Sequence, residues 1–147
     1  MNSTGPFVSA ALFCQAVIHE KDEHLSVMRI LDTITIHATE ANPVPLPIVV
    51  QSDAFISFKS GGFVGEKPLT IEFVNEQNIA RKPAQTFPAL KFNGGEHGAN
   101  VIIKLNVEIH DEGLYYLNVI LGEDLMTRVP LKVVIKRLKE SHTGSVS

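Results

Sequence analysis

The sequence predicts an all-β fold, a two-sheet antiparallel β-sandwich of about eight or nine strands. Apolar residues recur at every second position in segment after segment, and clusters of turn residues separate these segments at short intervals. No segment shows a sustained helical period, and the length of 147 residues suits a single domain that buries its own core. We therefore expect a loose tail over residues 1–7, one sandwich domain over residues 8–137 and a frayed tail over residues 138–147, with a closed barrel as the alternative architecture.

The first two predicted strands form a hairpin. Residues 8–19 alternate in a way that indicates a strand covered on much of both faces, and residues 25–38 resume β-branched character after a polar turn at residues 20–23. Asp32, inside the second run, indicates a bulge or a break. Three prolines between residues 42 and 47 withdraw ladder donors, so this segment is expected to connect strands and not to lie in a central one.

The remaining strands follow at short intervals. They are expected at residues 48–59, around 69–73, around 87–92, and at 101–109, 115–121 and 125–135. Turns at Ser60-Gly61-Gly62 and Gly94-Gly95 are predicted to separate the earlier ones. The clearest pattern is at 101–109, where one face is apolar and the other polar. In the last strand, the residues predicted to face inward are Val129, Leu131, Val133 and Ile135.

The segment Asp111-Glu112-Gly113-Leu114-Tyr115 resembles the tyrosine corner of immunoglobulin-like domains. In that corner a tyrosine ring packs at the sheet edge and its hydroxyl bonds to nearby backbone. We interpret Asp111, Gly113 and Tyr115 as structural residues and not as a ligand-contacting loop. The chain departs from the disulfide-bonded type, because Leu117 stands where the second cysteine would be and there is no tryptophan.

Two longer segments resemble a small bacterial family of domains of unknown function. They are ALFCQAVIHEKDEHLSVMRILDTI, from Ala11 to Ile34, and EGLYYLNVILGEDLMTRVPLKV, from Glu112 to Val133. The resemblance implies a sandwich-type fold for nearly the whole chain. It brings no catalytic residues to transfer.

Charge and cysteine content narrow the function classes. The net charge of −3 gives no general attraction to nucleic acid or to an anionic membrane. The single cysteine, Cys14, excludes an intrachain disulfide, and we interpret it as a small buried residue and not as a nucleophile or redox thiol. The apolar run from Phe7 to Ile18 is too short to span a bilayer, and no basic residue precedes Lys21. These features favour a cytoplasmic protein.

Candidate metal, phosphate and catalytic motifs are weak. The histidines His19, His24, His97 and His110 lack the spacing of a recognised zinc site, and the acidic turns lack the donor order of a calcium loop. The glycine-rich segment 61–67 resembles a phosphate loop but lacks the required Lys-Ser or Lys-Thr. No nucleophile elbow, cysteine–histidine signature or dinucleotide fingerprint is present. We therefore predict no cofactor and no enzymatic activity.

A basic strip lies on the last predicted strand. Spacing of four residues puts Arg128, Lys132 and Lys136 on one face. One interpretation is a docking surface for an acidic partner; the favoured one is an edge strand that positive charge protects from aggregation.

The sequence thus favours a non-enzymatic β-sandwich that binds another protein or itself, through an exposed strand edge or through the segments 60–67 and 93–99. The alternatives are a metal- or small-ligand-binding domain with hydrolytic activity, which would use the four histidines named above, and a structural subunit of a phage or secretion assembly.

Overall fold

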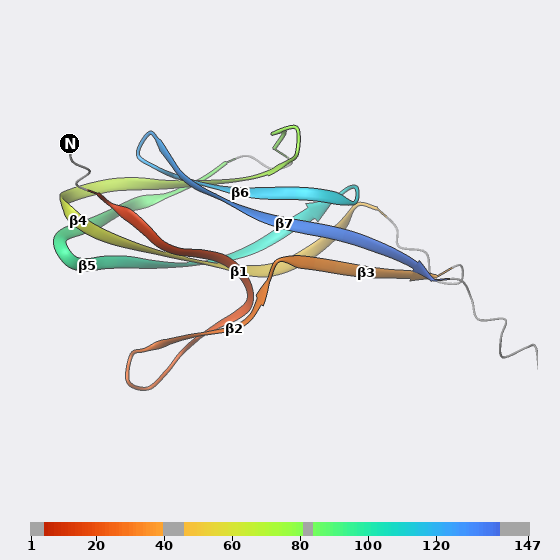
Figure 1. The fold of residues 1–147 in the computed structure, drawn as a ribbon, viewed down its shortest axis with the longest axis horizontal. Helices are drawn as coiled ribbons and strands as arrows, with labels where there is room; N and C mark the ends of the chain where they lie inside the picture. Colours follow the sequence, from red (N-terminus) through yellow and green to blue (C-terminus); the bar gives the residue numbers. More distant parts are fainter. Residues whose placement is uncertain (1–4, 40–45, 81–83, 139–147) are drawn as a thin grey trace, which may run out of the picture.

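In the computed structural model, which describes residues 5–39, 46–80 and 84–138, the strands form one hydrogen-bonded seven-stranded sheet (Figure 1). The strands are β1 (Phe7–His19), β2 (Leu25–Leu31), β3 (Thr33–Thr39), β4 (Ile48–Asn75), β5 (Gln85–Ile109), β6 (Gly113–Leu121) and β7 (Asp124–Leu138). Their order is β2-β1-β4-β6-β7-β3, and β5 pairs with β4 off this path. The described residues contain no helix that could cross a membrane. The all-β prediction is confirmed.

Parts of the predicted tails and of the proline-rich connection, at residues 1–4, 40–45 and 139–147, lie outside the described residues. Within the described part, β1 begins at Phe7 and β7 ends at Leu138, close to the predicted domain limits of 8 and 137.

The long hairpin of β4 and β5 changes its neighbours halfway along. β4 pairs with β5 from Ile48 to Ile71, and residues 53–59 of this stretch also pair with β1. Residues 69–75 pair with β6. Register shifts separate these two halves around Gly61, which faces Gly95 across the ladder. Both glycines have positive φ, 60° and 62°, a conformation that lets a strand bulge and bend without ending.

The turns predicted at Ser60–Gly62 and Gly94–Gly95 are therefore bulges within continuous strands. The segments predicted as separate strands at 48–59 and 69–73 join into β4, and those at 87–92 and 101–109 join into β5. This joining is one reason that the described residues form seven strands where the sequence predicted eight or nine.

The predicted strand over residues 25–38 divides at Asp32 into β2 and β3, which agrees with the break indicated there. β2 pairs with β1 in an antiparallel hairpin, whereas β3 pairs in parallel with β7, from Thr33 opposite Lys132 to Thr39 opposite Leu138. The carbonyl of Asp32 accepts a hydrogen bond from the Lys132 amide at 3.0 Å, where this pairing begins. The prediction of a wholly antiparallel arrangement was wrong for this pair.

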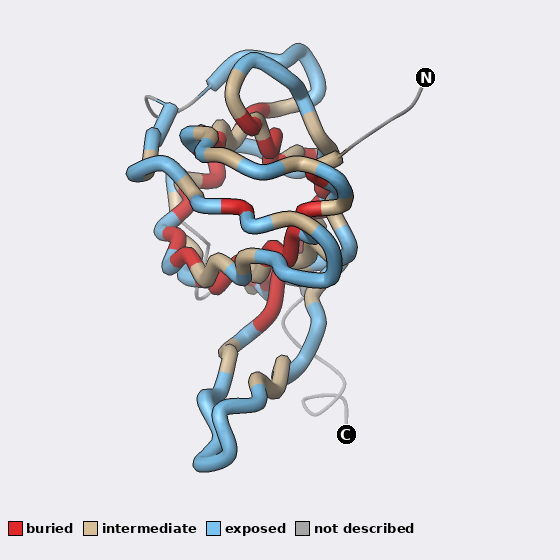
Figure 2. Tube along the Cα trace, turned by 90° about the vertical axis from the view of Figure 1, so that its left-hand side faces the viewer, coloured by how far each residue is buried: buried red, intermediate tan, exposed pale blue. Residues whose placement is uncertain are grey.

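The core lies where the two halves of β4 and their neighbours meet. Figure 2 shows the buried residues gathered in the body of the molecule. Phe13 of β1 packs edge-on against Phe73 in the second half of β4, with ring centroids 6.3 Å apart. Phe58 and Phe92 make a similar contact at 6.1 Å. The inward positions predicted for the last strand are confirmed: Val129, Leu131, Val133 and Ile135 are all buried. Burial of these apolar side chains is the main source of stability.

One part of the chain projects from the core. The pairing of β1 with β4 ends at Cys14, but its pairing with β2 continues to His19. Residues 15–29 therefore form a two-stranded arm that projects away from the core (Figures 1 and 2). The prediction that residues 8–19 are covered on much of both faces was wrong for the arm.

Candidate functional site

Tyr115 closes the turn between β5 and β6. Its hydroxyl donates to the Asp111 carbonyl at 2.7 Å and accepts from the Asp111 amide at 3.3 Å. Its ring stacks on Phe73 at 5.3 Å and is only 3% exposed. Gly113, with φ 141°, lets the chain turn between these two residues. All three residues of the predicted corner thus take part in the geometry of this turn.

A polar cleft of about 240 Å³ adjoins the corner, lined by residues 75–77 and 111–115. Two of its acidic side chains, Glu76 and Glu112, bond to the protein's own backbone. Glu76 accepts from the Leu114 amide at 3.2 Å, and Glu112 accepts from the Ile135 amide at 2.6 Å. The cleft therefore joins two turns by carboxylate–backbone bonds.

The histidines singled out in the sequence do not converge. His24 pairs with Asp22 at the tip of the arm, at 2.9 Å, whereas His110 pairs with Glu108 in β5, at 3.3 Å. His97 is exposed on the bulged part of β5. Among residues 5–39, 46–80 and 84–138, no group of three or more histidine, cysteine or acidic side chains could hold a metal ion.

Cys14 is a free, fully buried cysteine at the root of the arm. Burial and, secondarily, the carboxylate of Asp53 raise the pKa of its thiol. This environment opposes the thiolate form that nucleophilic chemistry requires.

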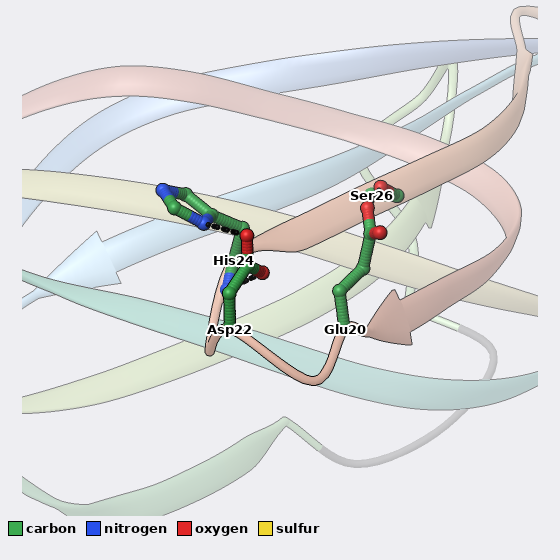
Figure 3. Close-up of polar contacts among 4 residues, drawn as sticks. All are labelled: Glu20, Asp22, His24 and Ser26. Carbon is green, nitrogen blue, oxygen red and sulfur yellow. Dashed lines mark hydrogen bonds and ion pairs between the residues drawn. The ribbon is translucent and has the colours of Figure 1, made fainter.

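The tip of the arm is an ordered acidic turn (Figure 3). The Glu20 amide donates to the His24 carbonyl at 2.8 Å, and the Glu23 amide donates to the Glu20 carbonyl at 2.9 Å. The Glu20 carboxylate accepts from the Ser26 hydroxyl. Hydrogen bonds from the His24 side chain and backbone lower the pKa of the Asp22 carboxyl. The turn thus presents charged, exposed carboxylates in a fixed conformation.

The arm also exposes large apolar side chains. On the arm, Ile18 is 42% exposed and Met28 47%, and at its root Ile30 is 63% exposed. The register sets Ala16 opposite Met28 and Ile18 opposite Ser26, so Ile18 and Met28 are diagonal neighbours on one face. Sequence reasoning missed these residues, because alternation alone cannot show that the strand continues beyond its sheet.

The outer edge of β2 is interrupted in its middle. Arg29 has φ 57°, a left-handed conformation that is uncommon for a residue with a side chain. It lies between Met28 and Ile30, where the ladder with β1 skips one pair. Such a kink hinders the addition of a further strand at this edge.

The basic strip divides into two parts. Arg128 donates through Nε to Asn118 Oδ1 at 2.8 Å and through a terminal nitrogen to Asn78 Oδ1 at 3.3 Å, and its guanidinium lies 4.1 Å from the Tyr116 ring centroid. Lys132 and Lys136 are exposed and make no ion pair within the described part of the chain. Arg128 therefore bonds within its own chain, whereas the side chains of Lys132 and Lys136 are accessible to a partner.

The edge-strand interpretation of β7 fits only part of the strand. From Lys132 onward β7 pairs with β3, and up to Val133 it pairs with β6. Residues 124–131 therefore have one unpaired side, and residues 134–138, Lys136 among them, pair only with β3.

The two segments proposed as contact loops lie together. Gly61 faces Gly95 and Val64 faces Asn93, so residues 60–67 and 93–99 are partner stretches of one bulged hairpin. Val64 is largely exposed there.

No protein-family model and no curated protein matches the sequence. Similar solved structures include an alkylpurine DNA glycosylase from Pseudomonas fluorescens bound to DNA with an abasic site analogue, at 9% identity over 84% of this chain and 30% of that chain, with a TM-score of 0.43. A β-glucosidase from Listeria innocua matches at 11% identity over 74% of this chain and 15% of that chain, with a TM-score of 0.43. A family 123 glycoside hydrolase from Clostridium perfringens matches at 14% identity over 90% and 28%, with a TM-score of 0.37. The chain spans less than a third of each protein, and similarity at this level carries no argument about its fold or activity.

Proposed function

We propose that this chain is a non-enzymatic, immunoglobulin-like β-sandwich of the cytoplasm that binds another polypeptide through the arm. The hydrogen bonds of Tyr115 with Asp111 and the bent β4–β5 hairpin support the sandwich assignment. The burial of the single cysteine supports a structural role for Cys14.

The observation that carries the proposal is the exposure of Ile18 and Met28 on the arm, with Ile30 exposed at its root. Scattered apolar side chains on a surface are ordinary, but several on one short projecting hairpin mark an interaction surface. The hydrogen-bonded tip reduces the conformational entropy that the arm loses when it binds. The kink at Arg29 favours contact through the face of the arm over strand addition at its edge.

The test places a photocrosslinking amino acid at Met28 in the full chain inside cells, with an exposed position on β5, Lys91, as the matched control. We expect a discrete adduct of higher mass from Met28 and none from Lys91. Equal labelling from both positions, or no adduct from Met28, would refute the proposal.

A further inference from the structure

We infer that the polypeptide bound by the arm is a second copy of this chain, and that each arm docks against the outer face of β7 of the other copy in a twofold dimer. This inference rests on the proposed function and names the partner and the receiving surface.

The charges of the two surfaces are complementary. The tip carries three carboxylates, Glu20, Asp22 and Glu23, against one ammonium group, Lys21. The lowered pKa of Asp22 keeps that carboxylate ionised. Opposite charges on patches of one chain attract between copies although the net charge of −3 is the same on both.

Within the described part of the chain, the receiving surface offers cations that form no ion pair. Lys132 and Lys136 lie on the outward face of β7, and His37 stands opposite Lys136 on β3. The nearby carboxylate of Glu112 already accepts from the Ile135 amide and lies 3.8 Å from Arg137. The lysines therefore remain available to an acidic segment from outside.

The same face offers apolar surface for the arm. Pro130 is exposed between the two outward positions 128 and 132, and the aliphatic stems of long cationic side chains cover apolar groups well. Ile18 and Met28 on the arm are the matching apolar groups. The contact thus combines a small apolar centre with a charged rim, the usual composition of a protein interface.

The position of the arm favours closure at two copies. Its root runs through Asp32 into β3, and Asp32 is hydrogen-bonded to Lys132, so the arm and the receiving face of one chain begin side by side. A twofold axis beside this point lets both arms exchange at once, and an exchange of identical patches closes without leaving a free site.

Charge reversal tests the pairing of the two surfaces. The purified full chain is measured by sedimentation velocity over a range of concentrations. Variant one carries Asp22→Lys and Glu23→Lys, and variant two carries Lys132→Glu and Lys136→Glu. We expect a wild-type dimer, a dissociation constant raised at least about tenfold in each variant, and dimers again when the two variants are mixed. Lys59→Glu with Lys91→Glu, two exposed lysines elsewhere, is the control that keeps the wild-type constant.

Unfolding midpoints of all variants show that each is folded before its association is compared. A monomeric wild type, a dimer indifferent to reversal of Lys132 and Lys136, a failure of the mixture to associate, or growth into larger species would each overturn the inference. If the purified chain is monomeric while Met28 crosslinks to a different protein in cells, the inference fails and the proposed function stands. If Met28 also gives no adduct, both fail.

Discussion

Replacing Tyr115 by phenylalanine isolates the hydroxyl that closes the β5–β6 turn. The ring keeps its stacking on Phe73, so the apolar burial is unchanged. What is lost is the bond to the Asp111 carbonyl at 2.7 Å and the longer one from the Asp111 amide at 3.3 Å. A typical net contribution is about 0.5–1.5 kcal/mol for each bond, and the second lies beyond the usual distance range. We therefore expect a loss of about 1–2 kcal/mol in the free energy of unfolding.

Urea unfolding of the two neighbouring tyrosine variants measures this loss. Tyr116→Phe is the matched control, because the Tyr116 hydroxyl makes no hydrogen bond to a described residue and its ring keeps its place under Arg128. It should change the unfolding free energy by less than about 0.5 kcal/mol. If Tyr115→Phe costs no more than Tyr116→Phe, the corner contributes nothing and the reasoning is wrong.

Three further predictions follow from single contacts. Gly98→Ala should lower the unfolding free energy by about 3 kcal/mol, because the new Cβ would lie 2.0 Å from a backbone oxygen of β4. At Gly95 a new Cβ meets open space, so Gly95→Ala should lower the unfolding free energy by only about 1 kcal/mol, for the positive φ of this residue. Equal losses in urea unfolding would contradict this. Arg128→Lys should lower the unfolding free energy by about 1–2 kcal/mol, because the hydrogen bond to the buried Asn118 is lost. Lys132→Met should change it by less than about 0.5 kcal/mol. A larger loss for Lys132→Met than for Arg128→Lys would be inconsistent with the structure. Burial raises the pKa of the Cys14 thiol, so the contribution of the protonated thiol to stability is present below pH of about 8.5 and is lost as pH rises further. Between pH 7 and 10, the denaturant midpoint of the wild type should therefore fall more steeply than that of Cys14→Ala. Parallel curves for the two proteins would contradict this prediction.

The alternating pattern was enough to predict the class of the fold and the inward side of its last strands. In β7, Val129, Leu131, Val133 and Ile135 are buried as expected, since a side-chain period of two fixes which face meets the core. The spacing from Asp111 to Tyr115 likewise located the turn that the tyrosine hydroxyl closes. Both features are local, so a single segment carries the whole signal.

The strand boundaries and pairings were less predictable because they depend on distant residues. A Ser-Gly-Gly stretch usually indicates a turn, but here Gly61 faces Gly95 on the neighbouring strand, and the two bulge together. The division at Asp32 was visible, yet the parallel partner of β3 was not. That pairing is set by the position of β7, which lies about a hundred residues along the chain.

The basic strip shows why candidate sites need three-dimensional context. Arg128, Lys132 and Lys136 look alike in the sequence, but only Arg128 has Asn118 beside it on β6, because the register sets Asn118 opposite Arg128. The sequence gives the charge of each residue. It does not say which charges neighbouring strands already satisfy.

The arm shows most clearly what an alternating pattern cannot predict. An alternating strand looks the same whether its apolar face is covered by the same chain or by another, because the period reflects burial and not the source of the cover. Residues 8–14 of β1 are paired with β4, whereas Ile18 continues the same alternation beyond this pairing and is 42% exposed. A position that the pattern predicts to be buried, and that the structure exposes, is therefore where a partner is expected. Ile18 is such a position, and Met28 is its exposed diagonal neighbour on the same face.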